Sequence, residues 1–85
     1  MDVDRAASTM IGDRYRDRIV LGKTKEQLRD RFGYLTNLSE ASPYRRGCYF
    51  LSGRTGKEVL FIRNRDWMIV FDGDRATELV LIKGC

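Results

Sequence analysis

The sequence predicts an α+β fold in which two N-terminal helices pack on one face of a three- to four-stranded antiparallel meander. Three observations support this prediction. Apolar residues recur at three- and four-residue steps early in the chain. Helix start and stop signals frame residues 24–33. After residue 44 the hydrophobic period changes to two, which is typical of strands. A chain of 85 residues with these elements is expected to form one small domain.

The first helix is expected over residues 3–18, which contain no proline. Gly12 lies inside this stretch and favours a bend or break there. The apolar stripe of the helix consists of Ala6, Ala7, Met10, Ile11 and Tyr15, and it can extend to Ile19.

The second helix is expected over residues 25–32. Thr24 can cap its start, and Gln27, three residues later, completes a capping-box pattern. Gly33 can end it in a left-handed conformation. The helix is too short to be stable alone, so it must dock on the sheet. Its expected docking side is formed by Leu21, Leu28, Phe32 and Leu35, with Tyr34 folded back onto it.

Residues 36–43 are polar and turn-forming, and they join the helical half to the strand half. Asp72-Gly73 is the strongest hairpin signal in the chain. Both faces of the last strands are apolar, so a covering partner is expected on the second face, either another protein or a second copy. The expected strands are residues 46–51, 58–63, 67–72 and 76–82.

Composition indicates a folded, soluble chain, with 42% hydrophobic and 33% charged residues. No apolar run approaches the ~20 residues of a membrane span, and no signal peptide is expected after Met1. The net charge is +4, and many arginines sit beside an aspartate, which favours local ion pairs over a continuous phosphate-binding track.

The sequence contains no histidine, which excludes zinc sites of the Cys/His type and nucleophiles activated by histidine. The stretch "SGRTGKE" at 52–58 lacks the glycine spacing of a phosphate-binding loop, and "DGDR" lacks the spaced ligands of a calcium loop. We therefore predict no enzyme activity, no cofactor and no metal. Cys48 is expected to be a small buried residue and Cys85 a terminal thiol, and their spacing does not demand a disulfide.

A surface rich in arginine and aromatic residues is the candidate site for binding another protein, because these residue types are enriched at binding hot spots. The alternative is a nucleic-acid surface on which bases stack, extended by Arg54. Glu58 and Asp66 interrupt that basic patch, so nucleic acid is the less favoured partner. The candidate partner-binding residues are Tyr44, Arg45, Arg46, Arg63 and Arg65.

The order of "RAASTMIGD", "LGKTKEQLRDRFGYL", "YRRGCYFL" and "DWMIVFDGDRATELVLI" resembles the SmpA/OmlA (BamE-like) family over about Met10 to Ile82. The resemblance implies an ααβββ fold and a non-enzymatic accessory role. Family members are outer-membrane lipoproteins that support β-barrel assembly through protein contacts, and related inhibitor-type modules share the fold.

The sequence also departs from the family pattern. Tyr34-Leu35 follows Gly33 where the family commonly has Gly-x-Pro, and no lipidation cysteine lies near the start. No family binding residue is therefore carried over. The implied location is the bacterial cell envelope if an N-terminal anchor or signal was removed, and the cytoplasm otherwise.

Overall fold

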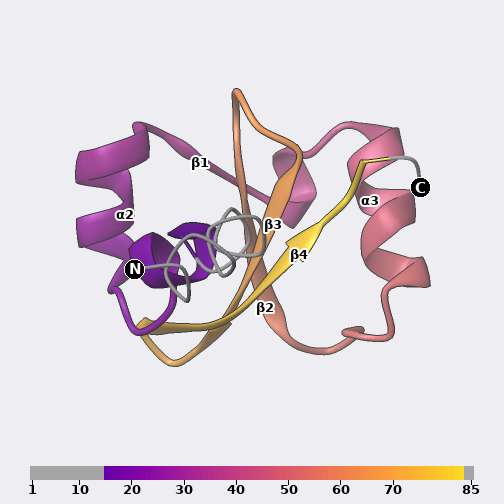
Figure 1. The fold of residues 1–85 in the computed structure, drawn as a ribbon. Helices are drawn as coiled ribbons and strands as arrows, with labels where there is room; N and C mark the ends of the chain where they lie inside the picture. Colours follow the sequence, from indigo (N-terminus) through magenta and orange to yellow (C-terminus); the bar gives the residue numbers. More distant parts are fainter. Residues whose placement is uncertain (1–14, 84–85) are drawn as a thin grey trace, which may run out of the picture.

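The computed structural model describes residues 15–83, which form helices and a four-stranded antiparallel sheet (Figure 1). The strand order β1-β2-β3-β4 follows the chain, so each strand pairs with the next. This confirms the predicted α+β class. The elements are a helical segment at 15–20, α2 (Lys25–Phe32), β1 (Leu35–Asn37), the 3₁₀ helix η1 (Leu38–Glu40), α3 (Pro43–Leu51), β2 (Glu58–Ile62), β3 (Trp67–Asp72) and β4 (Arg75–Leu81).

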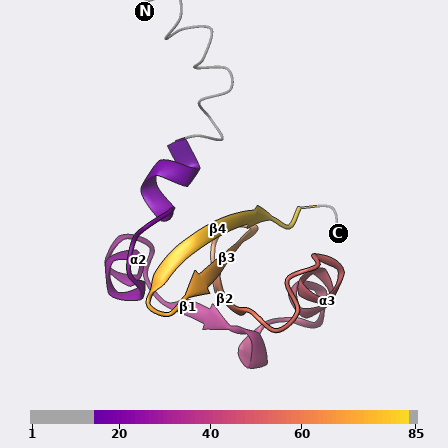
Figure 2. The same ribbon diagram turned by 90° about the horizontal axis from the view of Figure 1, so that it is seen from below.

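Helices cover both faces of the sheet, with α2 and α3 on opposite sides of it (Figure 2). On one face, the segment 15–20 and α2 contribute Val20 and Leu28 to a first buried cluster that contains Trp67, Ile69 and Phe71. On the other face, α3 contributes Cys48 and Tyr49 to a second cluster that contains Phe61, Met68 and Val70. The fold therefore has three layers, helix, sheet and helix, where two were predicted. The second sheet face, which was expected to be covered by a partner, is covered by α3 of the same chain.

The short helix predicted at 25–32 is confirmed as α2. The Thr24 hydroxyl accepts a hydrogen bond from the Gln27 amide at 3.1 Å, and the Gln27 side chain accepts one from the Thr24 amide at 2.9 Å. Gly33 ends the helix with a φ of +83°, which favours glycine. Leu28 is buried as predicted. Leu21 and Tyr34 are exposed, so these two residues do not belong to the side of the helix that docks on the sheet.

The strand predicted at 46–51 is wrong, because these residues belong to α3. The Ser42 side chain accepts a hydrogen bond from the Arg45 amide, and Pro43 occupies the first helical turn. Both residue types favour a helix start, because serine satisfies an orphan amide and proline has the φ that a helix needs. Cys48 is buried as predicted and lies one helical turn from Tyr44, a spacing that fits α3.

The linker predicted at 36–43 is more ordered than expected. It contains the end of β1 and all of η1, whose start is capped by the Asn37 side chain. Leu35 of β1 pairs with Ile62 of β2 and is buried in the first cluster. β1 therefore adds a short edge strand to the sheet.

The remaining strand predictions are confirmed within one residue at either end, and Gly73 sits in the β3–β4 turn with a φ of +63°. Residues 52–57 connect α3 to β2, where the Tyr49 hydroxyl accepts a hydrogen bond from the Gly56 amide. Most of the helix predicted at 3–18 lies outside the described residues, as does Cys85. In the part of the chain that the structure describes, no helix is both long and apolar enough to cross a membrane.

Candidate functional site

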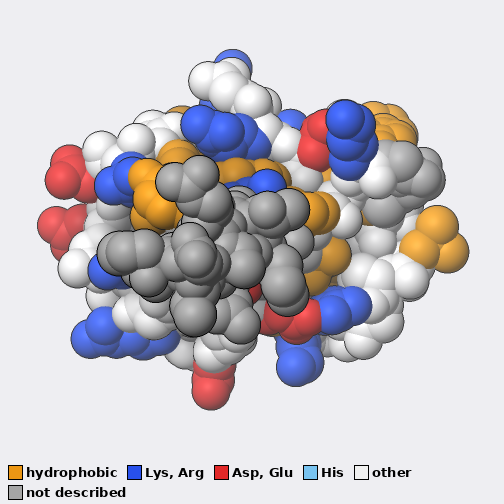
Figure 3. All heavy atoms as spheres, in the orientation of Figure 1, with side chains coloured by type: hydrophobic (Ala, Val, Ile, Leu, Met, Phe, Trp, Pro, Cys, Tyr) orange, Lys and Arg blue, Asp and Glu red, His pale blue; other side chains and the backbone are white. Residues whose placement is uncertain are grey.

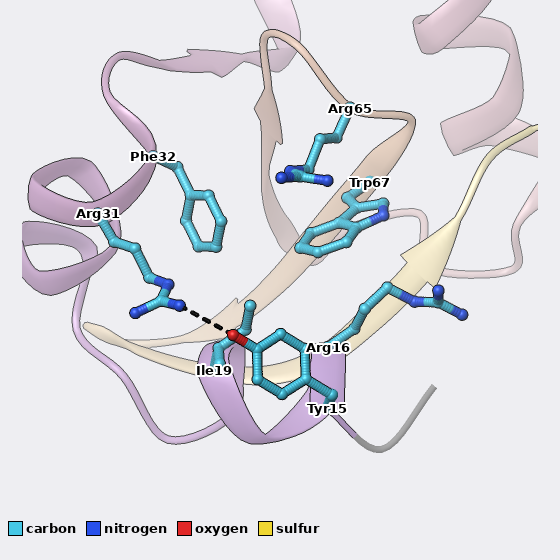
Figure 4. Close-up of a pocket in the computed structure, with 7 residues that line it drawn as sticks. All are labelled: Tyr15, Arg16, Ile19, Arg31, Phe32, Arg65 and Trp67. Carbon is cyan, nitrogen blue, oxygen red and sulfur yellow. Dashed lines mark hydrogen bonds between the residues drawn. The ribbon is translucent and has the colours of Figure 1, made fainter. Parts of the chain in front are cut away.

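A hollow of about 470 Å³ opens between the segment 15–20, α2 and the start of β3 (Figure 4). Three arginines from three different segments enter its lining, with aromatic side chains between them. None of the described residues that line it is acidic. We call this the cationic hollow; its lining residues are Tyr15, Arg16, Ile19, Arg31, Phe32, Arg65 and Trp67.

The aromatic rings of the cationic hollow hold two of its guanidinium groups in place. The Arg65 guanidinium lies over the Trp67 ring at 5.1 Å from the centroid, and that of Arg31 lies 5.8 Å from the Phe32 ring. Phe32 meets Trp67 edge-on, with centroids 5.8 Å apart. Arg31 also donates a hydrogen bond of 3.3 Å to the Tyr15 hydroxyl. These contacts limit the conformations of Arg31 and Arg65, which lowers the entropy cost of binding an anion.

A second hollow of about 320 Å³ adjoins the first at Arg16, Arg65 and Trp67. It carries the positive surface from α2 towards the end of β4. Figure 4 shows the Arg16 side chain extending in this direction, away from Phe32. We call it the side hollow; it is lined by Arg16, Asn64, Arg65, Asp66, Trp67, Leu81 and Lys83.

Elsewhere on the described surface, Arg54 and Lys25 are each paired with an acid. Arg54 forms a two-pronged ion pair with Glu78, which lowers the pKa of the Glu78 carboxyl and raises that of Arg54. Lys25 pairs with Glu58 at 2.6 Å. Carboxylates therefore compensate these two cations, whereas none of the described residues that line the cationic hollow is acidic.

Arg45, predicted to bind a partner, instead joins α3 to the β2–β3 turn. Its guanidinium donates hydrogen bonds to the carbonyl oxygens of Ile62 at 3.2 Å, Arg63 at 3.1 Å and Arg65 at 3.2 Å. It also lies 5.7 Å from the centre of the Phe61 ring. This set of contacts makes Arg45 a structural residue.

The other four predicted site residues do not form one surface. Tyr44 is half exposed, but its hydroxyl donates a 2.9 Å hydrogen bond to the Ile82 carbonyl oxygen. Arg46 is exposed on α3, while Arg63 lines a separate hollow beside Glu40. Arg65 alone of the five lines the cationic hollow.

Sequence reasoning missed Tyr15, Arg16 and Arg31. Tyr15 and Arg31 are separated by sixteen residues, and their contact arises only when the segment 15–20 and α2 cover the same sheet face. No local spacing signals such a contact. Figure 3 shows Lys and Arg side chains beside hydrophobic ones on this face, and further hydrophobic side chains standing out at the α3 end.

No group of three or more His, Cys, Asp or Glu within residues 15–83 is arranged to hold a metal ion. The Tyr34 hydroxyl donates a hydrogen bond to Glu40, which raises the pKa of Tyr34. That exposed pair joins the residue before β1 to the last residue of η1.

Neither a known protein family, nor a curated protein, nor a solved structure matches this chain. The resemblance to the SmpA/OmlA family stays a prediction. Within the described residues, α3 occupies the place of the Tyr-bearing strand that the resemblance implies.

Proposed function

We propose that this protein is a non-catalytic module that captures an acidic segment of another protein in the cationic hollow. The observation that carries the proposal is that Arg16, Arg31 and Arg65 line one hollow whose described lining contains no carboxylate. The planar guanidinium group matches a carboxylate with two parallel hydrogen bonds, so such a hollow favours aspartate or glutamate side chains. The accessory role in the cell envelope that the resemblance implies is part of this proposal.

The burial of Trp67 favours an acidic protein over nucleic acid as the ligand. Base stacking needs an open ring face. Trp67 is only 9% exposed, lies beneath Arg65 and meets the edge of Phe32, so its faces are not available for a base. An inhibitor or immunity-type role belongs to the same class, since it too depends on protein contacts.

Replacing Arg31 and Arg65 together by alanine should weaken binding of an acidic peptide at least about fivefold, because each lost charge pair is worth on the order of 0.5–1 kcal/mol. The probe is a short fluorescent peptide of alternating glutamate and valine, measured by anisotropy at physiological salt. Arg46→Ala is the control for a lost surface arginine: it removes one positive charge from an exposed position on α3, half of what the double variant loses.

Equal affinity of the double variant and the Arg46→Ala control would contradict the proposal. A short thymidine oligonucleotide provides a second comparison. If it binds more tightly than the peptide, with the steep salt dependence of phosphate contacts, nucleic acid is the ligand and the proposal fails. Thermal melting of each variant shows whether the fold is retained.

A further inference from the structure

β4 is an edge strand whose outer side is only partly covered. At its start, the Gly22 amide donates to the Ala76 carbonyl oxygen at 2.8 Å, and the Ala76 amide donates to the Lys23 carbonyl oxygen at 2.9 Å. Thr24 adds an isolated bridge to Arg75. Beyond Ala76, the structure over residues 15–83 gives the outer side of β4 no backbone partner.

The register identifies which backbone groups face this open edge. A bulge opposite Val70 and Phe71 shifts the alternation of β4 by one residue. After the bulge, the Ile82 amide donates towards β3, to the Asp66 carbonyl oxygen at 2.9 Å. Because the hydrogen-bonding direction alternates along an antiparallel strand, the N–H and C=O groups of Leu79 and Leu81 point away from β3.

The open edge runs beside the side hollow. Leu81 pairs with Trp67, lines the side hollow and is 49% exposed. Arg16 and Lys83 line the same hollow. On the opposite face of the sheet, Val80 and Ile82 pack against the second cluster. On one face, a strand added to this edge therefore meets a hollow in which the three cations Arg16, Arg65 and Lys83 outnumber the single carboxylate of Asp66. On the other face it meets an apolar surface.

We propose that an extended segment of the partner adds to the sheet as a fifth strand beside Leu79 and Leu81, with alternating acidic and apolar residues. Its backbone pairs with the open N–H and C=O groups, as in other strand additions. Its acidic side chains face Arg16 and Lys83, and its apolar side chains face the α3 side. This inference rests on the proposed function and specifies how the acidic segment is held.

The same observations disfavour the two other occupants. A second copy would bring its own Arg16 and Lys83 to an edge that already carries both, and like charges placed opposite each other destabilise a strand pair. Nucleic acid lacks the alternating N–H and C=O groups that complement a strand edge. An acidic peptide satisfies both the backbone and the charge.

The test uses the alternating glutamate–valine peptide and the same peptide with its alternate amides N-methylated on one edge, which keeps every charge but removes those backbone donors. With the unmodified peptide, amide hydrogen exchange by NMR should slow at Leu79 and Leu81. The N-methylated peptide should bind at least about fivefold more weakly, because backbone hydrogen bonds are lost.

On the protein side, Leu81→Pro removes one outward N–H, and Leu81→Ala is the matched control that keeps it. Proline is tolerated at an edge position whose N–H faces solvent. We expect weaker binding for Leu81→Pro alone. If Leu81→Pro fails to fold, the N-methylated peptide still decides the question on the unaltered protein.

Equal binding of both peptides would overturn strand addition but leave the proposed function intact. If the Arg31→Ala/Arg65→Ala variant still binds the peptide, and the peptide still slows amide exchange at Leu79 and Leu81, the cationic hollow is not the binding site. Strand addition at the β4 edge would then stand without it. A dimer in sedimentation whose formation protects the same two amides would assign the edge to a second copy and overturn this inference.

Discussion

Phe61→Ala should lower the free energy of unfolding by about 3–5 kcal/mol. The Phe61 side chain is 0% exposed in the second cluster, and β2 lies between β1 and β3. Its removal leaves a cavity that three surrounding elements cannot easily close, and it also removes the ring beneath Arg45. For a small domain this is a large fraction of the total stability.

Chemical denaturation measures this loss, and Phe50→Ala is the matched control. Phe50 is 60% exposed on α3, so the same change there should cost far less. If Phe61→Ala and Phe50→Ala unfold at similar denaturant concentrations, β2 is not the centre of the core. That result would also contradict the placement of α3 over the second face.

Arg45→Ala should lower the free energy of unfolding by about 2 kcal/mol. The guanidinium group joins α3 to three carbonyl oxygens around the β2–β3 turn, of Ile62, Arg63 and Arg65. Without it, these carbonyl oxygens lose a charged donor, and α3 loses its polar link to the sheet. Hydrogen bonds to charged groups are stronger than neutral ones, which is why one side chain has this effect.

The neighbouring arginine provides a direct comparison. Arg46 is exposed on the same helix, and Arg46→Ala should change stability by less than about 0.5 kcal/mol. Arg45→Lys should give an intermediate loss, because an ammonium group cannot reach three carbonyl oxygens with the same planar fork. If Arg45→Ala and Arg46→Ala have equal thermal stability but Arg45→Ala binds partner poorly, Arg45 is a binding residue and the structural assignment is wrong.

The two predictions for binding in the Results change Arg31, Arg65 and Leu81, of which Arg65 is linked to Arg45 through its carbonyl oxygen. The variants of Phe61 and Arg45 test the fold on the α3 side of the sheet. The binding variants test the opposite face and the edge of β4.

Local signals in the sequence were sufficient where they arise within a few residues. The capping residues Thr24 and Gln27 and the stop at Gly33 predicted α2, and Asp72-Gly73 predicted the β3–β4 turn. These signals act through backbone geometry and short-range hydrogen bonds, so they hold in any tertiary context. The alternation of apolar residues predicted β3 and β4 for a different reason, because a strand places every second side chain on the same face of the sheet.

The error at α3 came from reading its apolar residues as a strand pattern and overlooking the helix start at Ser42-Pro43. β1 was missed because three residues are too few to establish a period. Both faces of the sheet were correctly predicted to need cover. The source of that cover was not predicted, because an apolar face is satisfied equally well by a helix of the same chain or by a partner.

The sequence by itself determined the α+β class, the start and end of α2, the hairpin and the absence of histidine chemistry. Each of these follows from residue type or from neighbours along the chain. Tertiary structure alone decided that Arg45 is structural, that Arg16, Arg31 and Arg65 line one hollow, and that the β4 edge stays open within the described residues. The physical reason is that these features depend on contacts between distant segments, which form only when the helices close over the two sheet faces.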